Sequence, residues 1–280
     1  MNFVTAILML PPSGPSAVEQ SLGAALRSAA LDAVEMLRRI PAIDRIIIAA
    51  PDTERARTPA LNDVLWEVDP PGEFHFGERL ASIVRRHDLD RVLYLGAGSM
   101  PLMNESDVAA AVDRVAATDS ALAVTNNFHS ADWVALSHSG GIEDISHRLE
   151  RDNMLAWVLR EECGFAVSAL PPSAATRLDI DTPFDLCVLA LHPRTRSHLR
   201  GFLNELSPQL NLDQLRRAVE ILRAPGSRVM MIGRVSAAAW RYLESKTRCW
   251  TRALSEERGM AANRRQATNL QCIPATRCCL

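Results

Sequence analysis

The sequence predicts an α/β protein: a mostly parallel sheet with helices on both faces, followed by a small, mainly helical appendage. Three observations support this class. Short apolar runs alternate with longer amphipathic segments through the first two thirds of the chain. Ile46, Ile47 and Ile48 form a continuous β-branched run, which is typical of a strand buried on both faces. The length of 280 residues, 48% of them hydrophobic, suits one large domain with an appendage.

Each element follows from local periodicity and from its start and stop signals. Residues 17–39 place Leu22, Leu26, Ala33 and Leu37 on one helical face. The same reasoning, applied in order along the chain, predicts strands at 3–10, 44–49, 91–95, 121–125, 133–136 and 165–170, and helices at 17–39, 77–87, 105–117, 151–163 and 185–192.

The chain is expected to change character after its first domain. We expect the α/β domain to cover residues 1–193 and the appendage to cover 194–260, with helices at 199–206, 212–223 and 236–246 and a strand at 228–232. The tail, 261–280, lacks an apolar period and is expected to be disordered. Its final cysteine pair does not match the prenylation signal, which needs a cysteine four residues from the end.

Composition excludes several classes of function. The net charge of −2 provides no electrostatic argument for nucleic acid as a partner. The N-terminus lacks a basic leader and no apolar run is long enough to span a membrane, so we expect a cytoplasmic protein without a membrane partner. Lys246 is the only lysine, which makes lysine-dependent chemistry improbable. The six cysteines lack paired CxxC spacing, which argues against structural zinc.

Residues 177–186 are the most informative segment. An apolar-acidic alternation predicts a strand that ends with Asp179 and Asp181. Thr182 and Pro183 suit the N-cap and first position of the next helix, with Asp185 in its first turn. Two carboxylates would then lie at the sheet edge where open α/β sheets bind ligands. The alternative is a capped turn with solvated acids.

Two glycine-containing loops are expected at the same edge. In the first, residues 11–15, Pro11 opens the loop and the backbone N–H groups of Ser13 and Gly14 would face an anion at a helix N-terminus. Its three prolines fit a rigid turn equally well. In the second, residues 96–101, Gly96 and Gly98 allow close backbone approach to a ligand, and Ser99 supplies a hydroxyl group.

A third loop offers polar side chains for recognition. Asn126 and Asn127 each carry a donor and an acceptor, which suits a base or a sugar, and His129 can act as a general base or contact phosphate. The alternative is an asparagine-rich turn. In the appendage, Arg234 or Arg258 can clamp a phosphate, or belong to a solvated charge cluster.

The segment from Val92 to Leu102, Val-Leu-Tyr-Leu-Gly-Ala-Gly-Ser-Met-Pro-Leu, resembles the strand and Gly-Asp-x-Pro loop of GT-A-type nucleotidyltransferases. Asp179 to Leu186, Asp-Ile-Asp-Thr-Pro-Phe-Asp-Leu, is similar to their Asp/Asn-Thr-Pro-x-Asp-Leu element. This group includes the MobA-like molybdenum-cofactor guanylyltransferases and the cytidylyl- and guanylyltransferases of isoprenoid and deazaflavin-cofactor pathways. The resemblance covers roughly residues 3–190 and implies their three-layer Rossmann-like fold.

The resemblance also implies a site. Mg²⁺ would be held by Asp181 with Asp179, an NTP or nucleotide-sugar would lie on the first two loops, and a small phosphorylated or hydroxylated acceptor would lie near Asn126, Asn127 and His129. Asp181 and His129 would be the catalytic residues.

The sequence departs from the family pattern at two points. Ser99 stands where the family has its aspartate, and the family's glycine-rich first loop with a nearby lysine is missing. Losing both should weaken catalysis by orders of magnitude. Two hypotheses follow: a divergent nucleotidyltransferase or glycosyltransferase-like enzyme, in which Arg27 or Arg234 replaces the lysine, or a catalytically inactive nucleotide-sensing or partner-binding module. An oxidoreductase is disfavoured because no Gly-x-Gly-x-x-Gly follows the first strand.

Overall fold

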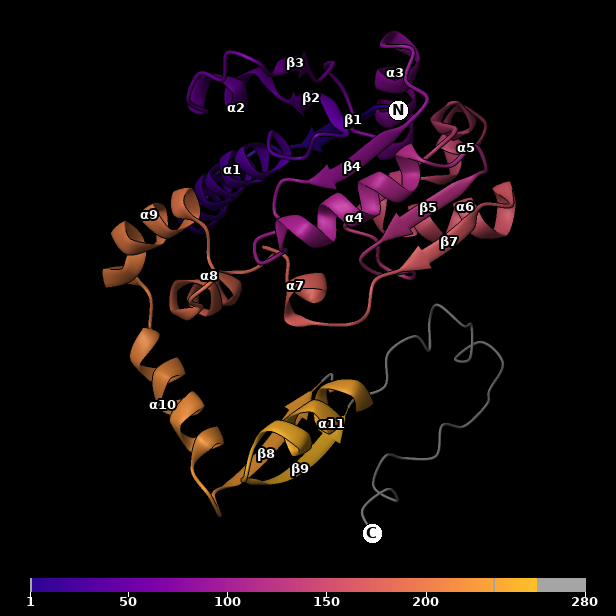
Figure 1. The fold of residues 1–280 in the computed structure, drawn as a ribbon. Helices are drawn as coiled ribbons and strands as arrows, with labels where there is room; N and C mark the ends of the chain where they lie inside the picture. The colour runs from indigo at the N-terminus through magenta and orange to yellow at the C-terminus, as the bar shows by residue number, and fades with distance from the viewer. Residues whose placement is uncertain (1, 234, 256–280) are drawn as a thin grey trace, which may run out of the picture. The chain divides into compact units, whose positions relative to one another are not determined.

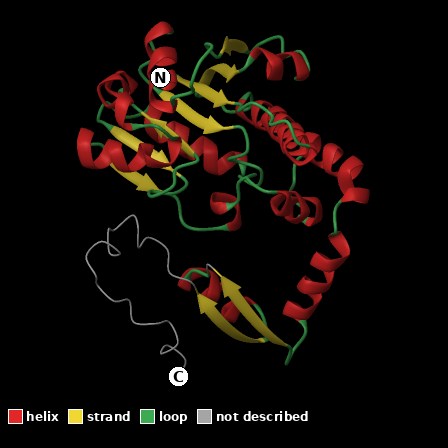
Figure 2. Ribbon diagram, turned by 180° about the vertical axis from the view of Figure 1, so that it is seen from behind, coloured by secondary structure: helices red, strands yellow, loops and turns green. Residues whose placement is uncertain are grey.

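The computed structural model describes residues 2–233 and 235–255, and the chain divides into two compact units after Leu210. Figure 1 follows the first unit through alternating strands and helices, and Figure 2 shows its strands side by side with helices on both faces. The prediction of a three-layer α/β fold with a mostly parallel sheet is confirmed.

The first unit contains a seven-stranded sheet in the order β3-β2-β1-β4-β6-β5-β7, in which β6 alone runs antiparallel to its neighbours. Its strands are β1 (Val4–Met9), β2 (Ile43–Ala50), β3 (Leu65–Val68), β4 (Val92–Gly96), β5 (Leu122–Thr125), β6 (Trp133–Leu136) and β7 (Ala166–Ala169).

Helices cover both faces of this sheet. The α-helices are α1 (Ala17–Leu37), α2 (Asp52–Arg57), α3 (Phe76–Arg86), α4 (Glu105–Ala116), α5 (Ile142–Ile145), α6 (Leu155–Cys163), α7 (Ala174–Arg177), α8 (Pro183–Leu191) and α9 (Ser197–Leu206). Short 3-10 turns are η1 (Ser139–Gly141), η2 (Ser146–Arg148), η3 (Asp152–Met154) and η4 (Ser207–Gln209). One buried cluster joins α1, α4 and α9 to the sheet, and a second joins α3, α5 and α6 to the opposite face.

The order of the strands determines where a ligand can enter. β1 pairs in parallel with β2 on one side and with β4 on the other. The first three strands are therefore added toward one edge of the sheet, and β4 is added on the other side of β1. The loops after β1 and β4 lead into α1 and α4 on the same face, and both begin at the carboxyl edge of the sheet, where open α/β sheets bind ligands. The first and second predicted loops both begin there.

Residues 178–181 differ from the prediction, because they form an extended connection between α7 and α8 rather than a strand. The sheet position beside β4 is occupied by β6, so the segment has no strand with which to pair. The cap after it is as predicted: Thr182 is the N-cap of α8, Pro183 is its first residue, and the Asp185 carboxylate accepts hydrogen bonds from the Thr182 N–H and hydroxyl.

The first unit also extends beyond residue 193, where the sequence placed its end. Leu199 and Leu203 of α9 are buried in the core cluster that contains α1. The Asp32 carboxylate of α1 accepts hydrogen bonds from the N–H groups of His198 and Leu199, both at 2.9 Å, and thereby caps α9. The helix predicted at 199–206 therefore belongs to the α/β unit.

The second unit contains α10 (Leu212–Arg223), β8 (Arg228–Gly233), α11 (Ala237–Lys246) and β9 (Trp250–Ser255). The sequence predicted the first three of these and missed β9, which pairs in parallel with β8 in a two-stranded sheet. Helices still make up more of the described part of this unit than strands, as predicted. The expected disordered tail, 261–280, and Arg258 lie outside the described residues. Across the described residues, no helix is both long enough and apolar enough to cross a membrane.

Candidate active site

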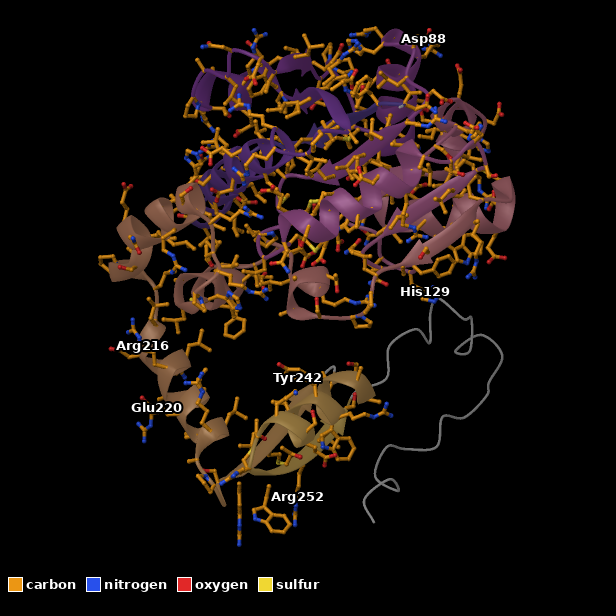
Figure 3. All side chains as sticks on the ribbon, viewed as in Figure 1. Asp88, His129, Arg216, Glu220, Tyr242 and Arg252 are labelled. Atoms are coloured by element: carbon orange, nitrogen blue, oxygen red, sulfur yellow. The ribbon has the colours of Figure 1, made fainter. Side chains whose placement is uncertain are left out.

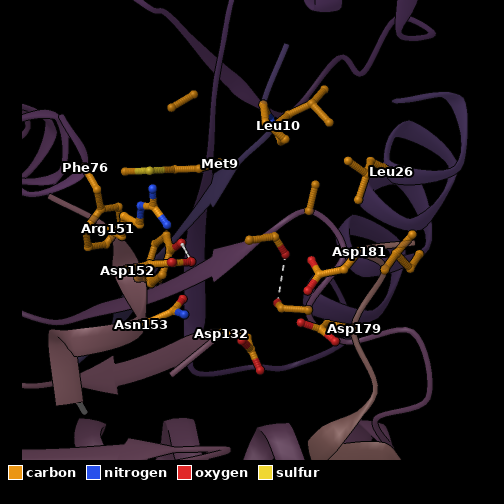
Figure 4. A pocket seen from close by; sticks show the side chains of 18 of the residues that line it. Met9, Leu10, Leu26, Phe76, Asp132, Arg151, Asp152, Asn153, Asp179 and Asp181 are labelled. Carbon is orange, nitrogen blue, oxygen red and sulfur yellow. Dashed lines mark hydrogen bonds between the residues drawn. The ribbon is translucent and has the colours of Figure 1, made fainter. Parts of the chain in front are cut away.

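A cavity of about 570 Å³ opens at the carboxyl ends of β1 and β4 (Figure 4). Asp179 and Asp181 lie on one side of it and Arg151 and Asp152 on the other, with Asp132 between them. It is lined by residues 9–12 after β1, 96–99 after β4, 150–153 before α6 and 179–181 before α8, together with Leu26, Ala49, Asp69, Phe74, Phe76, Tyr94, Ser130 and Asp132.

Gly98 fixes the acidic connection against the end of β4. The Ile180 N–H donates to the Gly98 carbonyl at 3.2 Å, and the Ile180 side chain is buried in the core. A Cβ atom on Gly98 would lie 2.7 Å from Leu26 Cδ2 and 3.1 Å from Ile180 Cβ. This close approach therefore depends on the absence of a side chain, and it holds Asp179 and Asp181 beside the β4 loop.

We expect Gly98→Ala to lower the free energy of unfolding by about 1–3 kcal/mol, because overpacking forces neighbouring atoms apart. It should also weaken ligand binding in the cavity, since Ile180 would move together with both acids. Gly96→Ala is the matched control, because its added Cβ would lie 3.8 Å from the nearest atoms. Urea titrations of both variants test this, and equal destabilisation would contradict the proposed close packing.

Six acidic residues line the cavity, with little compensating positive charge. Burial, followed by the charges of Asp181 and Asp132, raises the pKa of Asp179 to about 7. Burial also raises the pKa of Asp132 to about 6, with Asp152 and Asp181 adding repulsion and a hydrogen bond from Asn126 opposing it. Burial raises the pKa of Asp152 as well. Carboxylates are groups that can hold a cation.

Tyr94 fixes one of these acids in place. Its hydroxyl group donates to Asp152 Oδ2 at 2.7 Å, and its ring packs edge-on against Phe76 at a centroid distance of 4.8 Å. Burial, and then the charge of Asp152, raise the pKa of the Tyr94 phenol, so that it stays protonated and acts as a hydrogen-bond donor. Asp152 therefore has a fixed orientation at the cavity wall.

Six of the predicted site residues line this cavity: Pro11, Gly96, Gly98, Ser99, Asp179 and Asp181. The Ser99 hydroxyl group donates a hydrogen bond within its own turn, to the Gly96 carbonyl at 2.8 Å, so this proton is not free for a ligand. The two predicted loops and the acidic segment thus meet at one site.

Ser13 and Gly14 are not among the residues lining the cavity. The Ser13 N–H donates to Glu54 Oε1 at 3.1 Å, and Arg27 Nη1 lies 2.5 Å from Glu54 Oε2 and 3.1 Å from Ser13 Oγ. Glu54 is only 1% exposed. An internal carboxylate therefore takes the Ser13 N–H, one of the two donors predicted to bind an anion, and Arg27 is not available to replace the missing lysine. Arg234 lies outside the described residues.

Asn126, Asn127 and His129 are also absent from the cavity lining. The Asn126 amide is 1% exposed and positions Asp132, donating to its Oδ2 at 2.5 Å and accepting from its N–H at 3.1 Å. Asn127 Oδ1 accepts from the His129 N–H at 3.2 Å, which is the asparagine-rich turn given as the alternative. His129 is exposed at the surface of the first unit (Figure 3).

Sequence reasoning missed Tyr94, Asp132 and Asp152. The direction of β6 explains why Asp132 was missed: β6 runs antiparallel to β4, which pairs Trp133 with Leu95 and brings the residue before β6 to the same edge. Had the strand at 133–136 been assigned as antiparallel, its preceding aspartate would have been placed at the site.

Comparisons with known proteins identify the fold. No protein-family model and no curated protein sequence matches the chain. A Desulfovibrio desulfuricans protein provisionally assigned as a nucleotide-diphospho-sugar transferase has a TM-score of 0.56 at 15% identity, over 76% of this chain and 98% of its own. A Leptospira borgpetersenii cytidylyltransferase has a TM-score of 0.51 at 14% identity, over 74% and 95%.

A nucleotidyl transferase from Methanothermobacter gives a TM-score of 0.50 at 16% identity, over 73% of this chain and all of its own. At these identities the likeness establishes the fold alone. The first unit thus has the Rossmann-like fold of nucleotidyltransferases and nucleotide-diphospho-sugar transferases, with its cavity at the topological switch point.

Proposed function

We propose that this chain is a divergent nucleotidyltransferase-like protein that binds an NTP or a nucleotide-sugar in the cavity at the carboxyl edge of its sheet. It would transfer a nucleotidyl group to a small phosphorylated or hydroxylated acceptor. The observation that carries the proposal is the convergence of the β1 loop, the β4 loop and the Asp179–Asp181 segment on one acidic cavity at the switch point.

The chemistry of the cavity fits Mg²⁺. Carboxylate oxygens are its preferred protein ligands, and Mg²⁺ is usually held by one or two carboxylates together with substrate phosphates. Asp179 and Asp181 would hold it, and Asp132 would add negative charge nearby. When bound, the metal would neutralise the carboxylates and the phosphates of the ligand. The raised pKa values of Asp132 and Asp179 support this, because burial and then the neighbouring carboxylates disfavour their charged forms, and a cation would offset both effects.

A different grouping of possible metal ligands does not compete with this assignment. Asp32, Glu35 and His198 bring ligand atoms within 4.8 Å of one another. The Asp32 carboxylate already accepts two backbone hydrogen bonds from α9, and His198 Nε2 lies 2.7 Å from Glu35 Oε1. This cluster therefore serves to join α1 to α9.

A second candidate, a catalytically inactive nucleotide-sensing or partner-binding module, is favoured by the first loop. Glu54 takes the Ser13 N–H and Arg27, and Ser99 stands in place of an anionic metal ligand. Among the residues that the structure describes, Arg151 is then the one cationic side chain that lines the cavity. Weak stabilisation of the transferring phosphates would allow binding without turnover.

Isothermal titration with the four NTPs and with UDP- and GDP-sugars, each in the presence of Mg²⁺, tests the proposal. We expect Mg²⁺-dependent binding that Asp181→Asn weakens tenfold or more. Asp119→Asn is the control, because Asp119 is almost fully exposed and lies outside the cavity lining. Absence of binding to every ligand would refute the proposal. Turnover that disappears in Asp181→Asn would favour the enzyme, and binding without turnover would favour the sensor.

A further inference from the structure

Charge is strongly segregated along the chain, although the whole chain is nearly neutral. Residues 1–210 carry 18 Arg and Lys against 28 Asp and Glu, whereas residues 211–280 carry 13 against 5. The net charge of −2, which gave no reason to expect a polyanionic partner, is therefore the sum of an acidic unit and a basic one. A basic unit of this kind is an electrostatic signal for an anionic partner.

Among the described residues of the second unit, no element covers one face of the two-stranded sheet. Trp240 of α11 donates from Nε1 to Thr251 Oγ1 at 3.0 Å, so α11 covers the face to which Thr251 belongs. Side chains alternate along a strand, so Trp250 and Arg252 lie on the opposite face. In Figure 3, Arg252 and Tyr242 of α11 project from opposite sides of this unit.

Large apolar side chains dominate that open face. Met230 is 62% exposed, Ile232 72%, Trp250 75% and Leu254 42%. Strand register pairs Ile232 with Leu254, and places Arg228 opposite Trp250 and Arg252 opposite Met230. We call these six residues the open face. Parallel sheets are normally covered on both faces, and a clustered apolar patch of this kind marks an interaction surface.

We propose that the open face docks on an anionic lipid bilayer surface. Apolar side chains would enter the boundary between headgroups and acyl chains, and Arg228 and Arg252 would contact anionic headgroups. This function is independent of the nucleotide site. Peripheral docking of this kind does not need a membrane-spanning helix, and none is present among the described helices.

Two observations favour a lipid surface over other anionic partners. Arg228 and Arg252 lie among the apolar side chains of the open face itself, so a single lipid surface can take up both kinds of side chain. Arg241 and Lys246 belong to α11, which covers the opposite face, and they contribute only to the long-range attraction of the unit to an anionic surface. Three of the four exposed apolar residues are aliphatic, which gives single-stranded nucleic acid few aromatic platforms for base stacking.

A vesicle co-sedimentation assay with the full chain tests the proposal, using phosphatidylcholine vesicles with and without 30% phosphatidylserine, as an order-of-magnitude mimic of an anionic leaflet. We expect binding only to the anionic vesicles, with a blue shift of tryptophan fluorescence and weakening at high salt. Ile232→Ser combined with Trp250→Ser should lower the partition coefficient about tenfold or more. Arg228→Glu combined with Arg252→Glu should lower it by a similar factor.

Tyr242→Ser is the matched control, because Tyr242 is 64% exposed but belongs to α11 and not to the open face. It should leave vesicle binding unchanged. Because all the substituted side chains are exposed, circular dichroism should show folded variants. No binding to anionic vesicles would overturn the proposal. Two other results would also overturn it: tight binding to a labelled single-stranded oligonucleotide that Trp250→Ser abolishes, or a dimer in light scattering that Ile232→Ser disperses.

Discussion

Replacing Arg79 with leucine is expected to lower the free energy of unfolding by about 3–5 kcal/mol. Arg79 of α3 is 6% exposed, and its guanidinium donates to Asp69 Oδ1 at 2.9 Å and to the Glu67 and Val68 carbonyls at 3.1 and 3.2 Å. Leucine would fill the space but leave the Asp69 carboxylate and two carbonyl groups without this donor, while the Glu67 carboxylate would keep Arg86 and His87 as partners. Urea unfolding of the wild type and of Arg79→Leu at pH 7 measures this difference in the free energy of unfolding.

Arg85→Leu on the same helix is the matched control. Arg85 pairs with Glu143 at the surface, where both side chains are more than half exposed, so its loss should change stability by less than about 1 kcal/mol. Equal effects of the two substitutions would show that the buried network around Glu67 and Asp69 contributes no more to the free energy of unfolding than a surface ion pair does. Asp69 lines the cavity, so Arg79→Leu should also reduce ligand binding.

Asp179→Asn is expected to stabilise the protein at pH 8 and to have little effect near pH 4. The pKa of Asp179 is about 7 in the folded protein, against an ordinary value of 3.8. The folded state therefore holds this proton more tightly than the unfolded state, and stability falls as pH rises from about 4 to about 7. Asparagine cannot ionise, so the variant does not lose this stability. We expect its free energy of unfolding at pH 8 to exceed that of the wild type by about 1–2 kcal/mol, after allowing for solvent screening at a partly exposed position.

Urea unfolding at pH 4.5, 6 and 8 gives the comparison, and Asp119→Asn, at an almost fully exposed position outside the cavity lining, is the matched control. A stability difference between wild type and Asp179→Asn that stays constant across this range would contradict the raised pKa. Adding Mg²⁺ at pH 8 should narrow the difference, because a cation held by Asp179 and Asp181 would offset their repulsion in the wild type alone.

Apolar periodicity was sufficient to predict most of the sheet and its covering helices. The isoleucine run of β2 and the amphipathic face of α1 are local patterns, and each is buried as expected. β3 and β9 were missed, because they are short strands whose assignment depends on pairing with distant partners. The segment 178–181 shows the converse: a strand-like alternation does not form a strand when the neighbouring sheet position is already occupied.

The candidate site was predictable where it depends on the chain direction of parallel strands. Gly98 and Asp181 could be placed at one edge because each segment adjoins a predicted strand or helix start. The partners of Ser13 and Asn126 could not be predicted, because Glu54 lies 41 residues away from Ser13 and Asp132 approaches through the reversed strand β6. Which donors remain open to a ligand is determined by these non-local contacts.

The carboxylate of Glu54 suggests where redesign of this scaffold should begin. Arg57 lies 3.2 Å from Glu54 Oε1, so two guanidinium groups and one backbone amide already converge on a single side chain. A protein engineer seeking to install polyphosphate recognition would not need to graft a new loop after β1. Altering position 54 would release a ready-made set of donors, at the cost of leaving two neighbouring cations in need of a counterion.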